Sequence, residues 1–148
     1  MRRLVILALV GLVACGTSAA RAPPKVGTPT GAAAYTLTVQ AFQDPYTGPL
    51  AERTPPVADG MKRVGVEVTL ENTRRQAVLY SLSFFKLKDQ DGRDYRTPAE
   101  QYMLPDGVRF GGGTLAAGDK ARGWIPFEVP ATAKGLRLVY ELSVVLLD

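Results

Sequence analysis

The residues that could carry acid–base chemistry in this chain are its carboxylates, because the 148 residues include no histidine. Ser-His and Cys-His nucleophiles and His-ligated zinc or iron centres are therefore excluded. Glu67 and Glu71 share one face of a strand-like segment but lie about 13 Å apart by strand rise, too far for a glycosidase pair. Asp89, Asp91 and Asp94 lie closer together in a segment typical of a water-exposed turn. We assign no catalytic residue and keep a carboxylate-based hydrolase only as an alternative.

The same aspartates raise the question of calcium, since an EF-hand loop also begins with spaced acidic residues. That loop needs its glycine at the sixth position, whereas Gly92 is at the fourth position when Asp89 is counted as the first. Asp-Gly between two strand-like segments is instead a hairpin signal. The sequence thus predicts a turn here, with no metal site and no cofactor.

Cys15 is the only cysteine, and it follows an apolar stretch over residues 4–13 that begins after two arginines. These are the parts of an export signal, and about ten apolar residues are too few to cross a bilayer as a helix. The run Leu12-Val13-Ala14-Cys15 resembles the lipobox of bacterial lipoproteins. The resemblance implies a signal peptide over residues 1–14 and a diacylglyceryl membrane anchor on Cys15. Plain secretion, with cleavage within residues 17–20, is the alternative.

Two acyl chains give stable membrane residence, so the lipobox implies a protein of the bacterial cell envelope, outside the cytoplasm. Gly16 follows Cys15, where inner-membrane lipoproteins of Gram-negative bacteria tend to carry aspartate. The outer membrane is therefore favoured if the host has one.

The formal net charge of +4 comes entirely from the first 34 residues, and from Tyr35 onward the basic and acidic residues balance. A domain without net charge lacks the electrostatic footprint of a nucleic-acid-binding protein. We expect no nucleic-acid partner.

Residues 15–34 are rich in Pro, Gly and Ala and lack a periodic apolar pattern, which predicts a lipidated, disordered tether. Such a coil would span roughly 25 Å. A strand beginning at Val26 is the alternative. The remaining residues, 35–148, have the length of one domain.

Apolar and polar residues alternate with period two over residues 35–42, 63–71, 76–88, 121–129 and 136–147, which predicts strands. The first of these segments should direct Tyr35, Leu37, Val39 and Ala41 to one face. The last is expected to be one strand, with a shared face formed by Leu136, Leu138, Tyr140, Leu142, Val144 and Leu146. The phase changes at Phe84-Phe85, as at a bulge or a bend between sheets. Strands without a convincing helix predict a two-layer antiparallel sandwich.

Four segments, residues 64–72, 85–95, 113–118 and 123–130, occur in the order found in a known family. Together they resemble the immunoglobulin-like domain of unknown function of bacterial lipoproteins, which is related to the immunoprotective extracellular antigen family. The resemblance covers residues 35–148. It implies an all-β, immunoglobulin-like antiparallel β-sandwich of six to eight strands, without enzymatic activity and without functional residues to carry over.

The irregular segment 96–113 is the best candidate for a partner-binding loop, since aromatic residues on long loops often carry contact energy. Its candidate anchors are Tyr102, Met103 and Phe110, and the alternative is that these residues fold back as a lid over one end of the sandwich. Trp124 is expected to pack against a strand neighbour. The functional hypothesis is a lipid-anchored, non-catalytic binding module with an envelope protein partner. A structural or accessory lipoprotein within a larger complex is the alternative.

Overall fold

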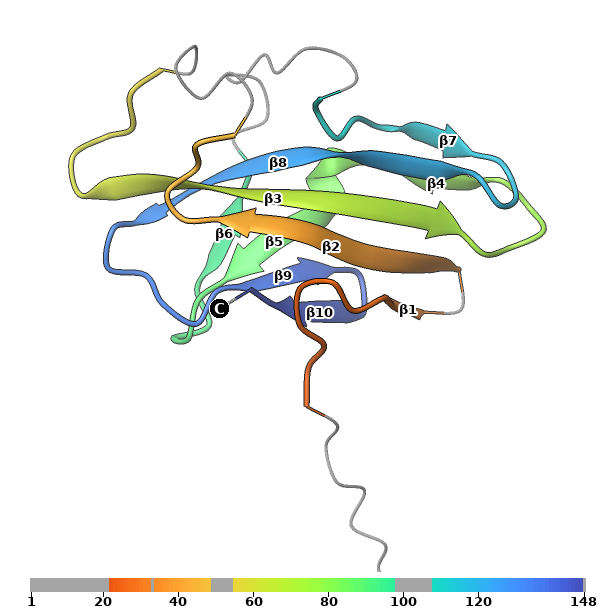
Figure 1. Cartoon of the computed structure of the whole chain (residues 1–148), viewed down its shortest axis with the longest axis horizontal. Coiled ribbons are helices and arrows are strands. Elements are labelled where there is room, and N and C mark those ends of the chain that lie inside the picture. The colour runs from red at the N-terminus through yellow and green to blue at the C-terminus, as the bar shows by residue number, and fades with distance from the viewer. Residues whose placement is uncertain (1–21, 33, 49–54, 98–107, 148) are drawn as a thin grey trace, which may run out of the picture.

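The computed structural model describes residues 22–32, 34–48, 55–97 and 108–147, and their regular structure is almost entirely β (Figure 1). The larger antiparallel sheet has the order β1-β2-β3-β8, formed by Thr30–Ala32, Tyr35–Gln43, Met61–Asn72 and Lys120–Pro130. The smaller has the order β10-β9-β5-β6, formed by Ser143–Leu146, Arg137–Tyr140, Phe85–Lys88 and Asp94–Arg96. A separate ribbon pairs β4 (Val78–Tyr80) with β7 (Gly113–Leu115).

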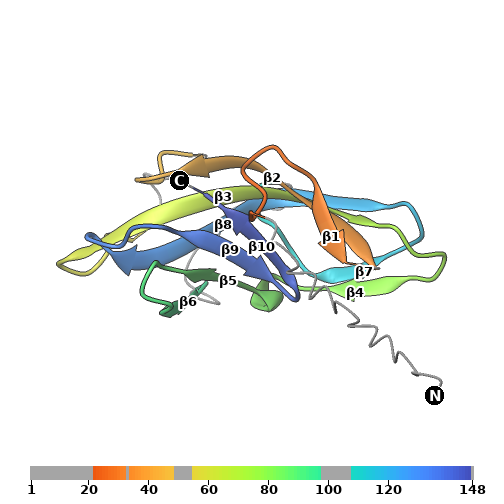
Figure 2. The same cartoon turned by 90° about the horizontal axis from the view of Figure 1, so that it is seen from below.

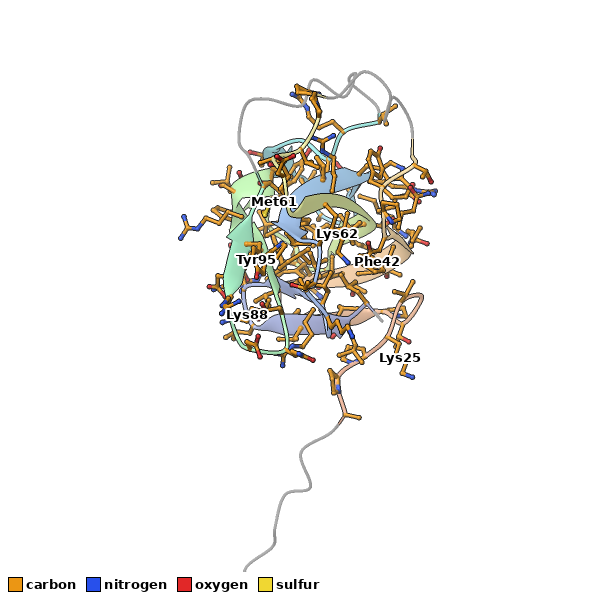
Figure 3. The ribbon with its side chains drawn as sticks, turned by 90° about the vertical axis from the view of Figure 1, so that its left-hand side faces the viewer. Lys25, Phe42, Met61, Lys62, Lys88 and Tyr95 are labelled. Atoms are coloured by element: carbon orange, nitrogen blue, oxygen red, sulfur yellow. The ribbon has the colours of Figure 1, made fainter. Side chains whose placement is uncertain are left out.

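The two sheets face each other as layers, which confirms the antiparallel β-sandwich. Seen end-on, Lys88 lies on the side of the smaller sheet, and Phe42 and Lys62 lie on the side of the larger one (Figure 3). The described residues form ten strands rather than six to eight, because several segments of three residues pair locally.

The core between the layers follows the alternation of the sequence. Val64, Val66 and Val68 on β3 are fully buried, as are Ile125 and Phe127 on the paired strand β8. Each buried large apolar side chain contributes about 1.5–3 kcal/mol relative to leaving it exposed. The central strand pair of the larger sheet is therefore held by apolar burial, as predicted.

Strand β2 departs from the expected pattern near its end. Its register with β3 shifts between Val39 and Ala41, so that Phe42 lies opposite Val66. Because the bulge reverses the side-chain phase, Phe42 and not Ala41 packs against the core. The prediction that Ala41 shares the inward face of Val39 is wrong for that reason.

The phase change at Phe84-Phe85 is a bend between sheets, which confirms one of the two predicted outcomes. β4 ends at Tyr80, a short 3-10 helix η2 (Leu82–Phe84) follows, and β5 then starts in the smaller sheet. The Ser81 hydroxyl caps η2 by accepting a hydrogen bond from the backbone N–H of Ser83 at 3.2 Å.

Residues 136–147 form a hairpin, so the prediction of one continuous strand is wrong. Tyr140 of β9 pairs with Ser143 of β10 across a turn made by Glu141 and Leu142. Glu141 adopts a left-handed backbone (φ 49°), and Leu142 is 89% exposed. Beyond the turn, Ser143, Val145 and Leu147 occupy the inward face, in place of the predicted Leu142, Val144 and Leu146.

The N-terminal segment over residues 24–32, which we name the clasp, is ordered against both sheets. Leu146 of β10 donates its backbone N–H to the carbonyl oxygen of Pro24, and Gly27 donates to the carbonyl oxygen of Val39 on β2, both at 2.8 Å. Strand β1 then pairs with the start of β2. Seen from below, the clasp crosses from β10 toward β2 (Figure 2). The prediction of a disordered tether up to residue 34 is therefore wrong for this part, and residues 1–21 lie outside the described residues.

Candidate binding surfaces

A pocket of about 300 Å³ opens where η2 meets the ends of β5 and β6. It is lined by Ser81, Leu82, Ser83, Phe85, Arg96 and Thr97. The last two residues begin the 96–113 segment that the sequence singled out as a binding loop. Tyr102 and Met103, the candidate anchors on that segment, lie outside the described residues.

Among the described residues that line the pocket, the polar ones are Ser81, Ser83, Thr97 and Arg96. The hydroxyls of Ser81 and Ser83 lie 2.8 Å apart and share a hydrogen bond. Arg96 is exposed, and its side chain has no hydrogen bond or ion pair with any part of the chain that the structure describes. Buried Phe85 gives the pocket an apolar wall. A mostly apolar cavity with a few polar groups is the usual form of a small-molecule site.

Phe110 is part of the core and not of a binding surface. It is fully buried, and its ring makes edge contacts with Tyr80 at 5.6 Å and Phe85 at 5.1 Å between centroids. Its backbone N–H donates to the carbonyl oxygen of Trp124, which holds this segment beside β8. A Cβ at Gly123 would overlap the backbone of Phe110, so glycine permits this approach. The prediction of Phe110 as a partner anchor is therefore wrong, and the alternative, folding back onto the sandwich, holds for it.

An aromatic pair lies on the outer side of the larger sheet. Trp124 contacts Tyr46 at 5.4 Å between ring centroids, and Tyr46 is 7% exposed. The Tyr46 ring lies directly over Gly65 of β3. Trp124 therefore packs against a neighbouring side chain as predicted, but this neighbour lies in the loop after β2 and not on a strand. Our sequence reasoning missed Tyr46, although a glycine within the regular alternation of β3 signals a close approach.

Three of the carboxylates considered for catalysis are engaged in ion pairs on the surface. Glu67 pairs with Arg122 at 2.9 Å, and Glu71 pairs with Lys120 at 3.1 Å, both across the β3–β8 ladder. Asp94 binds Lys86 and Lys88, and these hydrogen bonds hold the pKa of Asp94 below its usual value. A general acid near neutral pH needs a raised pKa instead.

Asp89 organises the β5–β6 turn. It is buried, and it accepts hydrogen bonds from the Tyr95 hydroxyl at 2.8 Å and the backbone N–H of Arg93 at 2.9 Å. Burial would raise the pKa of Asp89, but these bonds and one from the backbone of Asp91 together lower it. The predicted hairpin turn is confirmed, with Gly92 at φ 82°. Among the described residues, no three His, Cys, Asp or Glu side chains are grouped so as to hold a metal ion.

Asn72, the last residue of β3, has a structural role. Its buried amide donates to the carbonyl oxygens of Gln76, Leu115 and Ala116 and accepts from the N–H of Arg74. It thereby joins the turn after β3 to the segment after β7.

Cys15 lies outside the described residues, as does the whole predicted signal peptide. Within the described part of the chain, no helix is long and apolar enough to cross a membrane.

The fold and the pocket define the chain as an antiparallel β-sandwich with a small cavity at the end of its smaller sheet. The chain belongs to the DUF4352 family, a domain of unknown function, whose model matches residues 24–146. The match starts within the clasp, which agrees with a domain that begins before residue 35. No curated protein matches the sequence.

Solved structures share the fold at low sequence identity. The yjhA protein from Bacillus subtilis is 23% identical with a TM-score of 0.64, covering 84% of this chain and 99% of its own. The secreted protein MPT63 from Mycobacterium tuberculosis is 20% identical with a TM-score of 0.60, covering 86% and 98%. A candidate lipoprotein, ycdA, from Bacillus subtilis is 14% identical with a TM-score of 0.54, covering 83% and 38%.

Proposed function

We propose that this protein is a lipid-anchored interaction module outside the cytoplasm, without catalytic activity. The lipobox-like run that ends at Cys15 supports the anchor. The secreted nature of MPT63 and the description of ycdA as a candidate lipoprotein are consistent with this location.

One spatial relationship carries the proposal. The described part of the chain begins beside β10, on the lower side of the domain in Figure 1. The end of β6 and the described residues before β7 lie on the opposite, upper side. The nine residues that follow Cys15 as far as Pro24 can span at most roughly 32 Å when fully extended. An anchor on Cys15 would therefore keep the β10 side near the membrane and direct the pocket away from it.

The electrostatics of the described residues support a binding role over hydrolysis. Glu67, Glu71 and Asp94 are each held by cations, and Asp89 is held by hydrogen bonds within its turn. The balanced charge from Tyr35 onward favours a protein or small-molecule partner over nucleic acid. The partner we propose is an envelope protein, and its candidate contacts are the pocket and, from the sequence alone, Tyr102 and Met103.

The anchor is tested by growing cells that express the full chain with a fatty-acid analogue and measuring the label on the protein. Cys15→Ser should abolish the label, because the serine hydroxyl cannot replace the thiol. Ser18→Ala, which alters the site of plain secretion, should retain it. Continued labelling of Cys15→Ser would refute the anchor.

The partner surface is tested by pull-down of the full chain from envelope extracts. Tyr102→Ala and Met103→Ala should each lower recovery of a partner, whereas Leu79→Ala, at a 68% exposed position on β4, should not. Equal recovery with all three variants would contradict the surface. A stable complex of fixed stoichiometry that all variants retain would favour the accessory-subunit alternative.

A further inference from the structure

The outer face of the β5–β6 hairpin carries more cations than its one acid can neutralise. Lys86 and Lys88 alternate with inward residues on β5, and Asp94 and Arg96 do so on β6. Lys88 marks this side in Figure 3. Three cations and one carboxylate leave a net charge of +2 on the outer face of these two strands.

Two of these cations face each other. Arg96 is the cross-strand partner of Lys86 in the β5–β6 ladder. Like charges directly opposite each other destabilise a sheet. Asp94 does not relieve Arg96, because one of its oxygens binds Lys86 at 2.7 Å and the other binds Lys88 at 2.8 Å. Within the part of the chain that the structure describes, no carboxylate therefore offsets the repulsion between Arg96 and Lys86.

Arg96 also lines the pocket, beside the hydroxyls of Ser81 and Ser83 and the apolar side chains of Leu82 and Phe85. A guanidinium binds a carboxylate through two parallel hydrogen bonds, which gives both strength and orientation. A cavity of about 300 Å³ is at the lower end of the size of small-molecule sites.

We propose that this pocket binds a small organic carboxylate. Arg96 pairs with the carboxylate group in the field of Lys86, and the apolar body of the ligand contacts Leu82 and Phe85. This inference rests on the proposed role as a binding module but not on the lipid anchor, so a failed labelling experiment would leave it standing.

The test is isothermal titration calorimetry of the full chain with phenylacetate, and with 2-phenylethanol as the uncharged analogue. Phenylacetate should bind and 2-phenylethanol should bind at least about tenfold more weakly, because only the former makes a charge-assisted pair. Arg96→Gln should weaken phenylacetate binding by about tenfold or more. Arg75→Gln removes the same charge from an exposed turn and should leave binding unchanged.

The melting temperature measured without ligand distinguishes a structural role of Arg96 from a role in ligand binding. Arg96→Gln should keep or slightly raise it at low salt, because the like-charge pair is removed. A clear fall in melting temperature would show Arg96 to be structural and would overturn the proposal. Equal binding of both probes, an equal loss in Arg75→Gln, or no Arg96-dependent binding of phenylacetate at about 1 mM would also overturn it. Arg96-dependent binding to phosphatidylglycerol vesicles but not to phenylacetate would identify a membrane-contact face instead.

Discussion

Leu146 donates a backbone hydrogen bond to Pro24 at 2.8 Å, although the two residues lie near opposite ends of the chain. Gly27 of the same clasp donates to Val39, so one short segment is bonded to a strand of each sheet. Sheet edges leave backbone groups unpaired, and the clasp satisfies some of these groups on β10 and β2. The clasp is therefore part of the folded domain and not a spacer.

Deletion of residues 24–32 should destabilise the sandwich, because it removes the β1–β2 pairing and both hydrogen bonds of the clasp. We expect a loss of about 2–4 kcal/mol in the free energy of unfolding, measured by urea denaturation. Lys25→Ala is the matched control, since it leaves the backbone bonds in place. An unchanged urea midpoint for the deletion would contradict an integral clasp.

Gly65→Ala should displace the ring of Tyr46, because the new Cβ would overlap that ring. The expected cost is about 1–3 kcal/mol, typical of overpacking. Trp124 is the only tryptophan and contacts Tyr46, so its fluorescence reports both the displacement and the unfolding. Gly111→Ala, where a Cβ meets nothing within 4 Å, should be neutral. Adding Tyr46→Ala should suppress the effect of Gly65→Ala, and full additivity of the two changes would count against this contact.

Acid should destabilise the β5–β6 turn, because the pKa values of Asp89 and Asp94 are lowered from 3.8 in the folded state. A carboxyl group with a depressed folded pKa stabilises the fold above its unfolded pKa, and this contribution is lost as pH falls through the folded value. Tyr95→Phe removes a hydrogen bond that lowers the Asp89 pKa.

This variant should therefore be less stable than the parent at pH 7, and the difference in unfolding free energy should shrink on titration from pH 7 to below the ordinary aspartate pKa of about 3.9. Urea denaturation across that range measures it. If the difference in unfolding free energy between the variant and the parent stayed constant with pH, the effect of Tyr95 would not depend on the ionisation of Asp89.

Alkali should act on Tyr140, whose pKa is raised to about 12 chiefly by burial, with smaller effects of the charges of Glu141 and Tyr35. A group with a raised folded pKa gives its full stabilisation below the unfolded pKa of about 10, and this is lost as pH rises toward 12. Stability should thus decline over pH 10–12, less steeply in Tyr140→Phe. Thermal melts at stepped pH measure the slopes, and equal slopes would assign the decline to other groups.

The parts of the fold that could be predicted are those with a long, regular alternation. Much of β3 and β8 alternates buried and less buried side chains, so the pattern of the flanking residues predicts that Val64 and Phe127 are buried. The β9–β10 hairpin could not be found in this way, since Glu141 and Leu142 carry no glycine or asparagine turn signal. The sequence keeps alternating apolar and polar residues through these two positions, but after the turn the other set of side chains is buried.

The clasp and the pocket could not be predicted from local sequence patterns, for a different physical reason. The clasp is held by backbone groups paired with distant strands, and neither side-chain composition nor periodicity encodes such bonds. The pocket joins Ser81, on the bend between sheets, to Arg96, at the end of β6, and only the strand register brings them together. Phe110 lies beside a run of glycines that suggested an exposed loop, yet its ring is buried in the core, and the glycine that permits its close approach is Gly123 on β8.

The clasp also determines how a mechanical load would enter the domain. A force applied to the chain from the side of Cys15 would first load the hydrogen bond between the N–H of Leu146, on the last strand, and the carbonyl oxygen of Pro24. The bond between Gly27 and Val39 then shares the tension with the other layer. If Cys15 carries the proposed lipid anchor, a force from the membrane would thus be divided between both sheets before it could separate β1 from β2.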